Sequence, residues 1–245
     1  MQFDKDKFHD ALRAALRENP AYDRPSAEEK KLLAAAEAVP ADAGALYRAG
    51  ESRDKAAATP AARALYEKAI AAAPESEWAA RANLRLAILS RHERAWTDAE
   101  KRLAAAEALN EGDRFAIADD CAMERAYKLL ADKQDAKALE ILDGAIRRHP
   151  SSNRMGELRF YAGVANFNLD RKKWAHYHWW WVLENLPKDH HVIRCSVALT
   201  AEANCFANPE LGGYAGAKEM TINEGVIERN RARADYEELK DKYGK

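Results

Sequence analysis

Small and bulky residues alternate along the chain in a fixed order, at intervals that suit helices. A small residue is followed 12 positions later by alanine, then by a bulky residue at +4 and a small residue at +7 from that alanine. The four copies are Gly50, Ala62, Tyr66, Ala69; Ala87, Ala99, Leu103, Ala106; Ala126, Ala138, Leu142, Ala145; and Gly163, Ala175, Trp179, Val182. Proline follows three of them, at Pro74, Pro150 and Pro187, where it is expected to end a helix. The pattern therefore predicts four pairs of helices.

The shared frame also predicts how the two helices of a pair meet. Small residues let two helices approach closely, and the bulky residue fills the space between them. We expect Ala69, Ala106 and Ala145 to be buried at such close contacts.

This frame resembles the tetratricopeptide repeat, in a long-repeat bacterial form. The resemblance implies an all-α fold, a right-handed superhelical solenoid of antiparallel helix hairpins. Successive alanine marks lie 37, 39 and 37 residues apart, whereas the family period is 34, so the extra residues are expected between hairpins or in first helices. The family's early tryptophan is replaced by Leu46, Asn83, Ala122 and Arg159. Longer repeats of this kind also resemble those of outer-membrane assembly lipoproteins and related periplasmic repeat proteins.

The organisation predicted for the whole chain has three parts. Residues 1–40 form an N-terminal helical hairpin, a degenerate repeat, and residues 41–187 form the four repeats. Residues 188–245 hold another degenerate repeat, with a first helix at 189–206, and a C-terminal capping helix that begins after Thr221. Solenoids need atypical terminal units to cover their open ends.

Composition narrows the function classes. The chain has 39 basic and 40 acidic residues, interspersed, so no nucleic-acid footprint is expected. The three cysteines, Cys121, Cys195 and Cys205, fit small buried side chains in a reducing compartment better than a disulfide. No signal peptide and no transmembrane segment is predicted, which favours a cytoplasmic location. A periplasmic location remains open if a signal peptide has been removed.

No catalytic motif appears, so we expect neither an enzyme nor a cofactor. Four histidines lie close in sequence, at His176, His178, His190 and His191. A metal site would need histidines on one helix face, but His176 and His178 diverge by about 200°. Solvated or packed histidines are the favoured interpretation, and no metal site is predicted.

The segment around Trp179 holds three consecutive tryptophans. Trp179 takes the buried mark of its repeat, whereas Trp180 and Trp181 point largely away from it. Either the C-terminal helix or a following hairpin covers them, or they form an exposed contact site for a partner or a second copy of the chain.

The family resemblance implies that first helices line a concave groove at set positions. Seven of these positions are expected to bind a partner: Leu84, Ile88, Arg91, Met123, Tyr127, Phe160 and Phe167. We expect an accessible apolar groove centred on Leu84, Ile88, Met123, Tyr127 and Phe160; the alternative is that the longer repeats rotate the helices and bury part of this set. The predicted function is a scaffold that binds a partner helix or peptide there. The alternative is an obligate structural subunit of a larger assembly, possibly in the cell envelope, that uses Trp180 and Trp181 on its convex face.

Overall fold

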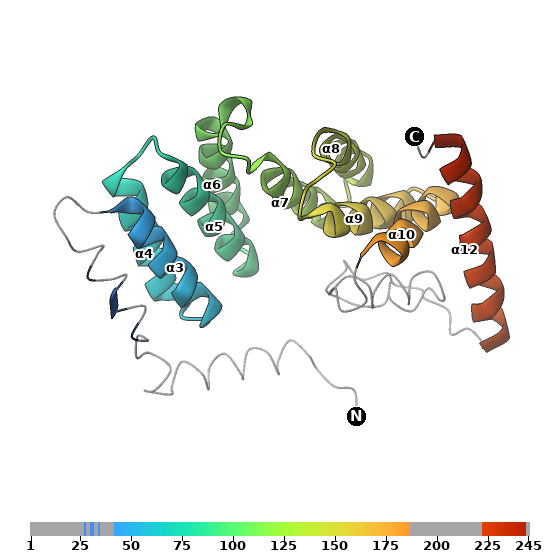
Figure 1. The fold of residues 1–245 in the computed structure, drawn as a ribbon, viewed down its shortest axis with the longest axis horizontal. Helices are drawn as coiled ribbons and strands as arrows, with labels where there is room; N and C mark the ends of the chain where they lie inside the picture. Colours follow the sequence, from blue (N-terminus) through green and yellow to red (C-terminus); the bar gives the residue numbers. More distant parts are fainter. Residues whose placement is uncertain (1–26, 28–29, 32–33, 35–41, 187–221, 244–245) are drawn as a thin grey trace. The chain divides into compact units, whose positions relative to one another are not determined.

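The computed structural model describes residues 27, 30–31, 34, 42–186 and 222–243 (Figure 1). Within these residues the chain is helical and contains no strand, which confirms the all-α prediction. The chain forms two compact units, residues 1–117 and 118–245. Apart from residues 27, 30–31 and 34, the predicted hairpin at 1–40 lies outside the described residues, as do the predicted helix at 189–206 and Pro187, His190, His191, Cys195 and Cys205.

The first unit contains two helical hairpins. They are built from α3 (Ala43–Lys55) with α4 (Thr59–Ala72), and from α5 (Glu77–His92) with α6 (Trp96–Leu109). A short 3-10 helix, η1 (Glu111–Asp113), follows them. Each helix packs against the next along the chain, and the two first helices, α3 and α5, also touch.

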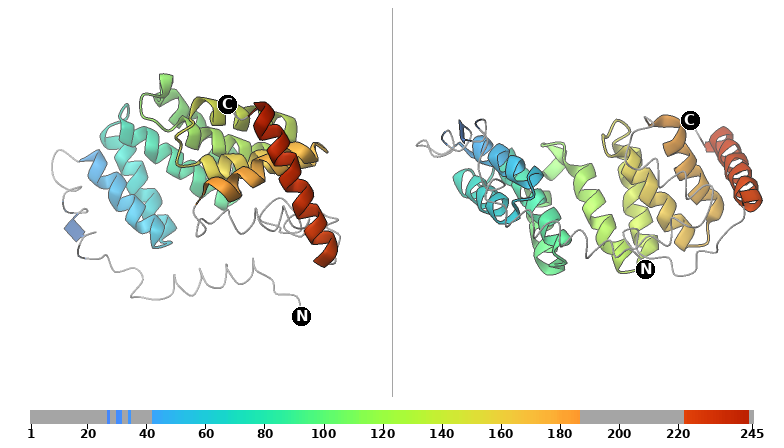
Figure 2. Two further views of the ribbon diagram at one scale, coloured as in Figure 1. Left: turned by 45° about the vertical axis from the view of Figure 1, so that its right-hand side comes forward. Right: turned by 90° about the horizontal axis from the view of Figure 1, so that it is seen from below.

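The second unit repeats this arrangement with α7 (Ala118–Ala131), α8 (Asp135–Arg148), α9 (Met155–Asn168) and α10 (Lys172–Asn185). A longer helix, α12 (Ile222–Tyr243), then packs on α10 (Figures 1 and 2). Consecutive packing of neighbouring helices is compatible with a helical repeat. The right-handed superhelix stays a prediction.

All four hairpins turn in the same way. Three residues join the two helices, and the middle one is left-handed: Ala57, Arg94, Lys133 and Asp170 have φ of 56, 60, 57 and 58°. In each turn the next N–H donates to the carbonyl five residues back, for example from Ala58 to Arg53 at 2.9 Å. This bond satisfies a carbonyl at the helix end. The residues that lengthen the repeat lie in both of the places that the sequence allowed. The connections at 110–117 and 149–154 are long, whereas 73–76 is short and the first helix after it, α5, is extended to 16 residues.

Side chains cap only some of the helix starts. Asp42 Oδ1 accepts from the Gly44 and Ala45 amides at 2.9 and 3.2 Å, and Ser76 Oγ accepts from the Ala79 amide at 3.2 Å. These two residues begin α3 and α5, because they satisfy amides that have no partner within the helix. Pro60 lies in the first turn of α4, where its missing N–H costs nothing.

The core of each hairpin is the frame found in the sequence. All of its 16 positions are buried, and Ala69, Ala106 and Ala145 are completely so, which confirms the expectation for these three alanines. A Cβ atom added to Gly50 would lie 2.7 Å from Tyr66 Cε1, and one added to Gly163 would lie 2.1 Å from Trp179 Nε1. The small residue thus faces the bulky one across the hairpin. Where it is glycine the bulky residue is aromatic, and where it is alanine, at Ala87 and Ala126, the bulky residue is leucine.

Replacing Gly50 by alanine should therefore destabilise the protein. The new Cβ would overlap the Tyr66 ring, at a cost of about 1–3 kcal/mol that outweighs the gain of about 1 kcal/mol in helix propensity. The control is Gly144→Ala in α8, where the nearest atom to a new Cβ is the flexible end of Arg148 at 3.4 Å. Urea unfolding should show Gly50→Ala less stable and Gly144→Ala more stable than the parent. A Gly50→Ala variant as stable as the parent, or more stable, would show that the Gly50–Tyr66 contact is not tight.

Candidate functional site

The structure buries five of the nine residues expected to bind a partner. Leu84, Ile88, Met123, Phe160 and Trp180 are exposed by only 5, 8, 0, 1 and 9%. The accessible groove was expected to centre on the first four of these residues and Tyr127, so that prediction is wrong for four of its five members.

For Leu84, Ile88 and Phe160 the reason is that the first helices α5 and α9 are buried around most of their circumference rather than along one stripe. Ten residues of α5 and ten of α9 are buried, compared with four of α4 and three of α6. Both helices pack against their own partner helix and against the preceding hairpin, whereas the predicted groove assumed one open face. Met123 of α7, which has only four buried residues, is covered by the core that it shares with α8 and α9. The alternative given above, that part of the groove set is buried, is correct for Leu84, Ile88, Met123 and Phe160.

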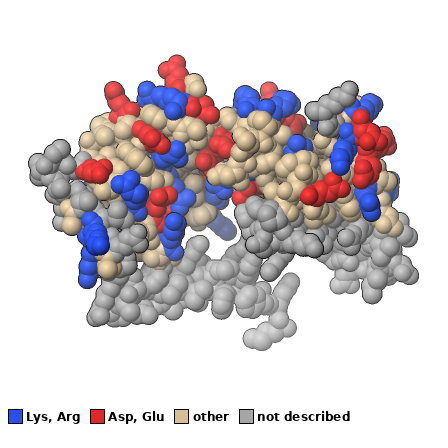
Figure 3. All heavy atoms as spheres, in the orientation of Figure 1, with Lys and Arg blue, Asp and Glu red and all other residues tan. Residues whose placement is uncertain are grey.

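The other four residues, Arg91, Tyr127, Phe167 and Trp181, are half-buried. Tyr127 belongs to a patch that the groove prediction only partly identified. It meets Tyr161 edge to face, with ring centroids 4.7 Å apart, and Leu130 packs on the same core beneath them. We call Tyr127, Leu130 and Tyr161 the aromatic patch. Over α7 and α9, uncharged side chains form a continuous stretch of the visible surface (Figure 3).

Equivalent positions of the first unit carry charge instead. Counted from the small residue of each frame, Tyr127, Leu130 and Tyr161 correspond to Glu51, Asp54 and Arg85. Arg85 pairs with Asp54, which also accepts from the Tyr66 hydroxyl at 3.4 Å. Glu51 accepts from the Tyr47 hydroxyl at 3.2 Å. Two of the three charges of the first unit therefore form an ion pair, whereas the three matched positions of the second unit carry no charge.

Burial is the main cause of the shifted pKa values of the two tyrosines beside these charges. It raises the pKa of Tyr47 and of Tyr66, with added effect from Glu51 and Asp54 respectively. Burial alone would lower the pKa of Arg85, but Asp54 raises it on balance. Both tyrosines therefore stay neutral and Arg85 stays charged, as a structural ion pair requires.

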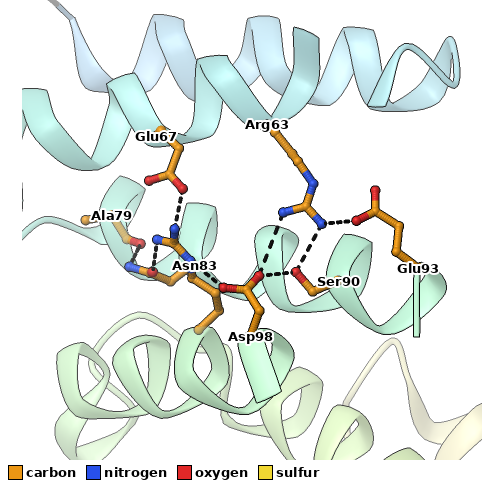
Figure 4. Close-up of polar contacts among 8 residues, drawn as sticks. Arg63, Glu67, Ala79, Asn83, Ser90, Glu93 and Asp98 are labelled. Atoms are coloured by element: carbon orange, nitrogen blue, oxygen red, sulfur yellow. Dashed lines mark hydrogen bonds and ion pairs between the residues drawn. The ribbon is translucent and has the colours of Figure 1, made fainter. Parts of the chain in front are cut away.

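A polar network joins α4 to the second hairpin of the first unit (Figure 4). Arg63 donates to Ser90 at 3.1 Å and to Glu93 at 2.7 Å, and Ser90 in turn donates to Asp98. The Arg102 guanidinium pairs with Glu67 through Nη2 and donates to Asn83 Oδ1 at 3.4 Å through Nη1. Every charged group of this network has an oppositely charged neighbour. Its arrangement joins α4, α5 and α6 and so helps to fix how the two hairpins pack.

The same junction in the second unit holds a histidine where the first unit has Arg102. Asp143, Arg159 and His178 occupy the positions of Glu67, Asn83 and Arg102. His178 Nε2 lies 3.9 Å from Asp143, and neither His178 Nδ1 nor Arg159 Nε has a hydrogen-bond partner. Burial lowers the pKa of His178 to about 3, and Arg159 adds to this effect, so the ring is neutral near pH 7.

The tryptophan segment divides among three environments. Trp179 fills the hairpin core and donates to the Phe160 carbonyl at 3.1 Å. Trp180 packs with Tyr236 and Leu239 of α12. Trp181 is half-buried, with the Arg159 guanidinium 4.8 Å above its ring. The alternative in which Trp180 is an exposed contact site is therefore wrong, because α12 covers this residue.

Two histidines of this segment face different helices. His176 Nδ1 lies 2.9 Å from Asp235 of α12, whereas His178 faces α8. Among the residues that the structure describes, no group of histidine, cysteine or acidic side chains could hold a metal ion. None of the described helices is both long enough and apolar enough to span a bilayer.

Comparisons with known proteins add no relatives. No protein-family model matches the chain, and no curated protein matches it significantly.

The neutral state of His178 predicts a loss of stability in acid. The unfolded chain protonates this residue near pH 6.5, whereas the folded chain does so only near pH 3. Its contribution is therefore complete above pH 6.5 and falls by up to about 1.4 kcal/mol per pH unit below it. Urea unfolding between about pH 7 and about pH 5 should show a steeper loss for the parent than for His178→Asn. Equal slopes would mean that His178 titrates normally in the fold.

Proposed function

We propose that this protein is a non-enzymatic helical-repeat scaffold that binds a segment of another protein. The aromatic patch on α7 and α9 is the contact, and the hairpins belong to a tetratricopeptide-like array that forms a right-handed superhelix. The protein works in the cytoplasm, with the periplasm as the alternative. No cofactor takes part.

One observation carries this proposal: the Asp54–Arg85 ion pair of the first unit is replaced at the matched positions of the second by Leu130 and Tyr161, the latter beside Tyr127. Tyr161 and Tyr127 are half-buried, so part of each residue is still exposed. Large aromatic side chains that are already held in place lose little freedom on binding, and they dominate the energy of protein interfaces. The T-shaped pair of tyrosines and its neighbour Phe160, 5.0 Å from Tyr161, form such a fixed support.

The use of polar groups supports a scaffold over an enzyme. Arg63, Arg85 and Arg102 each join helices through carboxylates. These groups stabilise packing, and their pairing leaves them poorly suited to act on a substrate.

The alternative function, an assembly subunit that uses its tryptophans, is less well supported. It needs Trp180 and Trp181 at the surface, but Trp180 is 9% exposed beneath α12. This alternative is open only if α12 leaves α10.

The proposal can be tested with a phage-displayed library of random linear peptides selected on the immobilised protein. Peptides with several large apolar residues should be enriched. Their affinity should fall at least about 30-fold in Tyr127→Ala/Tyr161→Ala, as expected when two interface anchors are removed.

Two control variants distinguish contact from folding. Tyr127→Phe/Tyr161→Phe keeps both rings and should retain most of the affinity. Arg48→Ala/Glu51→Ala changes the first helix of the other unit, where Arg48 is exposed, and should bind like the parent. Circular dichroism checks that each variant is folded. Failure to enrich any peptide, or binding that ignores the two alanine substitutions, would contradict the proposal.

A further inference from the structure

Three arginines of the second unit belong to the junction at which α8 and α10 pack on α9. They are Arg147 of α8, Arg159 of α9 and Arg171, which directly precedes α10, and we call them the arginine cluster. At the matched junction of the first unit the corresponding residues are Ala71, Asn83 and Ala95. Three uncharged side chains in one unit are thus replaced by three positive charges in the other.

One carboxylate, that of Asp143 in α8, lies near the whole cluster. Burial raises the pKa of Asp143, and each of the three arginines acts to lower it. An electrostatic effect of this kind requires the three guanidinium groups to lie near the same carboxylate. His178 Nε2 also approaches Asp143, at 3.9 Å, but this ring is neutral near pH 7 and adds no charge. Together, the cluster and Asp143 therefore carry an excess of two positive charges.

The arginine cluster has donors to spare. Among the residues that the structure describes, no member of the cluster forms an ion pair or a hydrogen bond through its side chain. The matched junction of the first unit differs, because its arginine, Arg102, pairs with Glu67 (Figure 4). Guanidinium groups with unused donors are suited to bind an anion from outside the protein, since charge-assisted hydrogen bonds are the strong ones.

Arg159 is the member of the cluster whose position is fixed by packing. It is half-buried, its guanidinium lies 4.8 Å from the Trp181 ring centroid and 5.7 Å from that of Tyr177, and its Nε atom is buried without a hydrogen-bond partner. Stacking on an aromatic face holds the planar group in one orientation and leaves its edge for hydrogen bonds. A side chain that is already held in place loses little freedom when it binds a ligand.

We infer that the arginine cluster binds a phosphate monoester, on a phosphorylated side chain of a partner or on a small molecule. Near pH 7 this group carries about 1.5 to 2 negative charges and presents three strong acceptor oxygens, which matches the excess positive charge and the unused donors. A carboxylate carries a single charge, and so does each phosphate of a nucleic-acid backbone, so both match the cluster less well. Arginine clusters are a recurring means of recognising phosphorylated segments. This inference does not depend on the aromatic patch.

Fluorescence polarisation can test the site with a labelled degenerate peptide library that contains one fixed phosphoserine. The same library with unphosphorylated serine is the reference, and both are measured near pH 7 at constant ionic strength. Phosphorylation should tighten binding at least about 10-fold, as expected for several charge-assisted hydrogen bonds. Free phosphoserine then competes in the same assay. A phosphopeptide that binds more tightly than the free amino acid identifies a protein segment as the ligand, whereas equal affinities identify a small phosphorylated molecule.

Three variants assign this binding to the cluster. Arg147→Ala/Arg171→Ala removes two exposed side chains and should lower the affinity for the phosphorylated library at least about 10-fold. Asp143→Asn removes the nearby negative charge and should raise that affinity at least about threefold, because repulsion of the phosphate is relieved. The control Arg48→Ala/Arg94→Ala removes the same amount of charge from exposed positions of the first unit and should bind like the parent. Circular dichroism checks that each variant is folded.

Two results would overturn the inference. Equal binding of the phosphorylated and unphosphorylated libraries, including no binding of either, would mean that the protein does not recognise the phosphate group. A loss of affinity in the control as large as in Arg147→Ala/Arg171→Ala would mean that any positive charge of the protein serves equally well. Weaker binding by Asp143→Asn than by the parent would contradict the assigned place of the phosphate, since the carboxylate would then not repel it.

Discussion

The close approach of the two helices in each hairpin is the constraint on which the rest of the structure depends. At Gly163 and Gly50 the second helix comes so near that a methyl group would overlap a ring. This distance fixes which faces of the helices remain for other contacts. In α9, for example, Phe160 lies inside the fold and Tyr161 at its edge, because neighbouring residues on a helix are about 100° apart.

The contact has two versions, and each conserves volume. Glycine faces tyrosine or tryptophan, and alanine faces leucine. A smaller residue on one helix is matched by a larger one on the other, so the spacing can be kept while the side chains change. The four three-residue turns, which share one conformation, fit this constant spacing. Polar residues then join neighbouring hairpins, as the ion pair between Arg102 of α6 and Glu67 of α4 does in the first unit.

The hairpins and their core could be predicted from sequence because the frame is local. Gly50, Ala62 and Tyr66 lie within 17 residues, and their order alone pairs two helices. The turns were harder to recognise, because alanine, arginine, lysine and aspartate stand where glycine usually marks a left-handed residue. The site was predicted less well, since burial of Leu84 or Met123 depends on packing between elements that a repeat frame does not specify. Tyr161 was missed because it lies one position beyond Phe160, on a face that the groove positions exclude. The charged counterparts at Asp54 and Arg85, 31 residues apart, became informative only when aligned with Leu130 and Tyr161.

These observations tie function to the spacing of helices. The aromatic patch and the α10 side chains that pack with α12, such as Tyr177 and Trp180, are bulky residues outside the four-position frame, on helices whose positions the frame determines. The claim that small and bulky residues set this spacing can be measured by a double-mutant cycle on Gly163→Ala and Trp179→Leu. Together these changes convert the fourth hairpin to the alanine–leucine pairing of the second and third. The double variant should be at least about 1 kcal/mol more stable than the sum of the two single losses predicts, because each change relieves the other. Losses that add to within about 0.5 kcal/mol would contradict the account, since the two residues would then not be in tight contact.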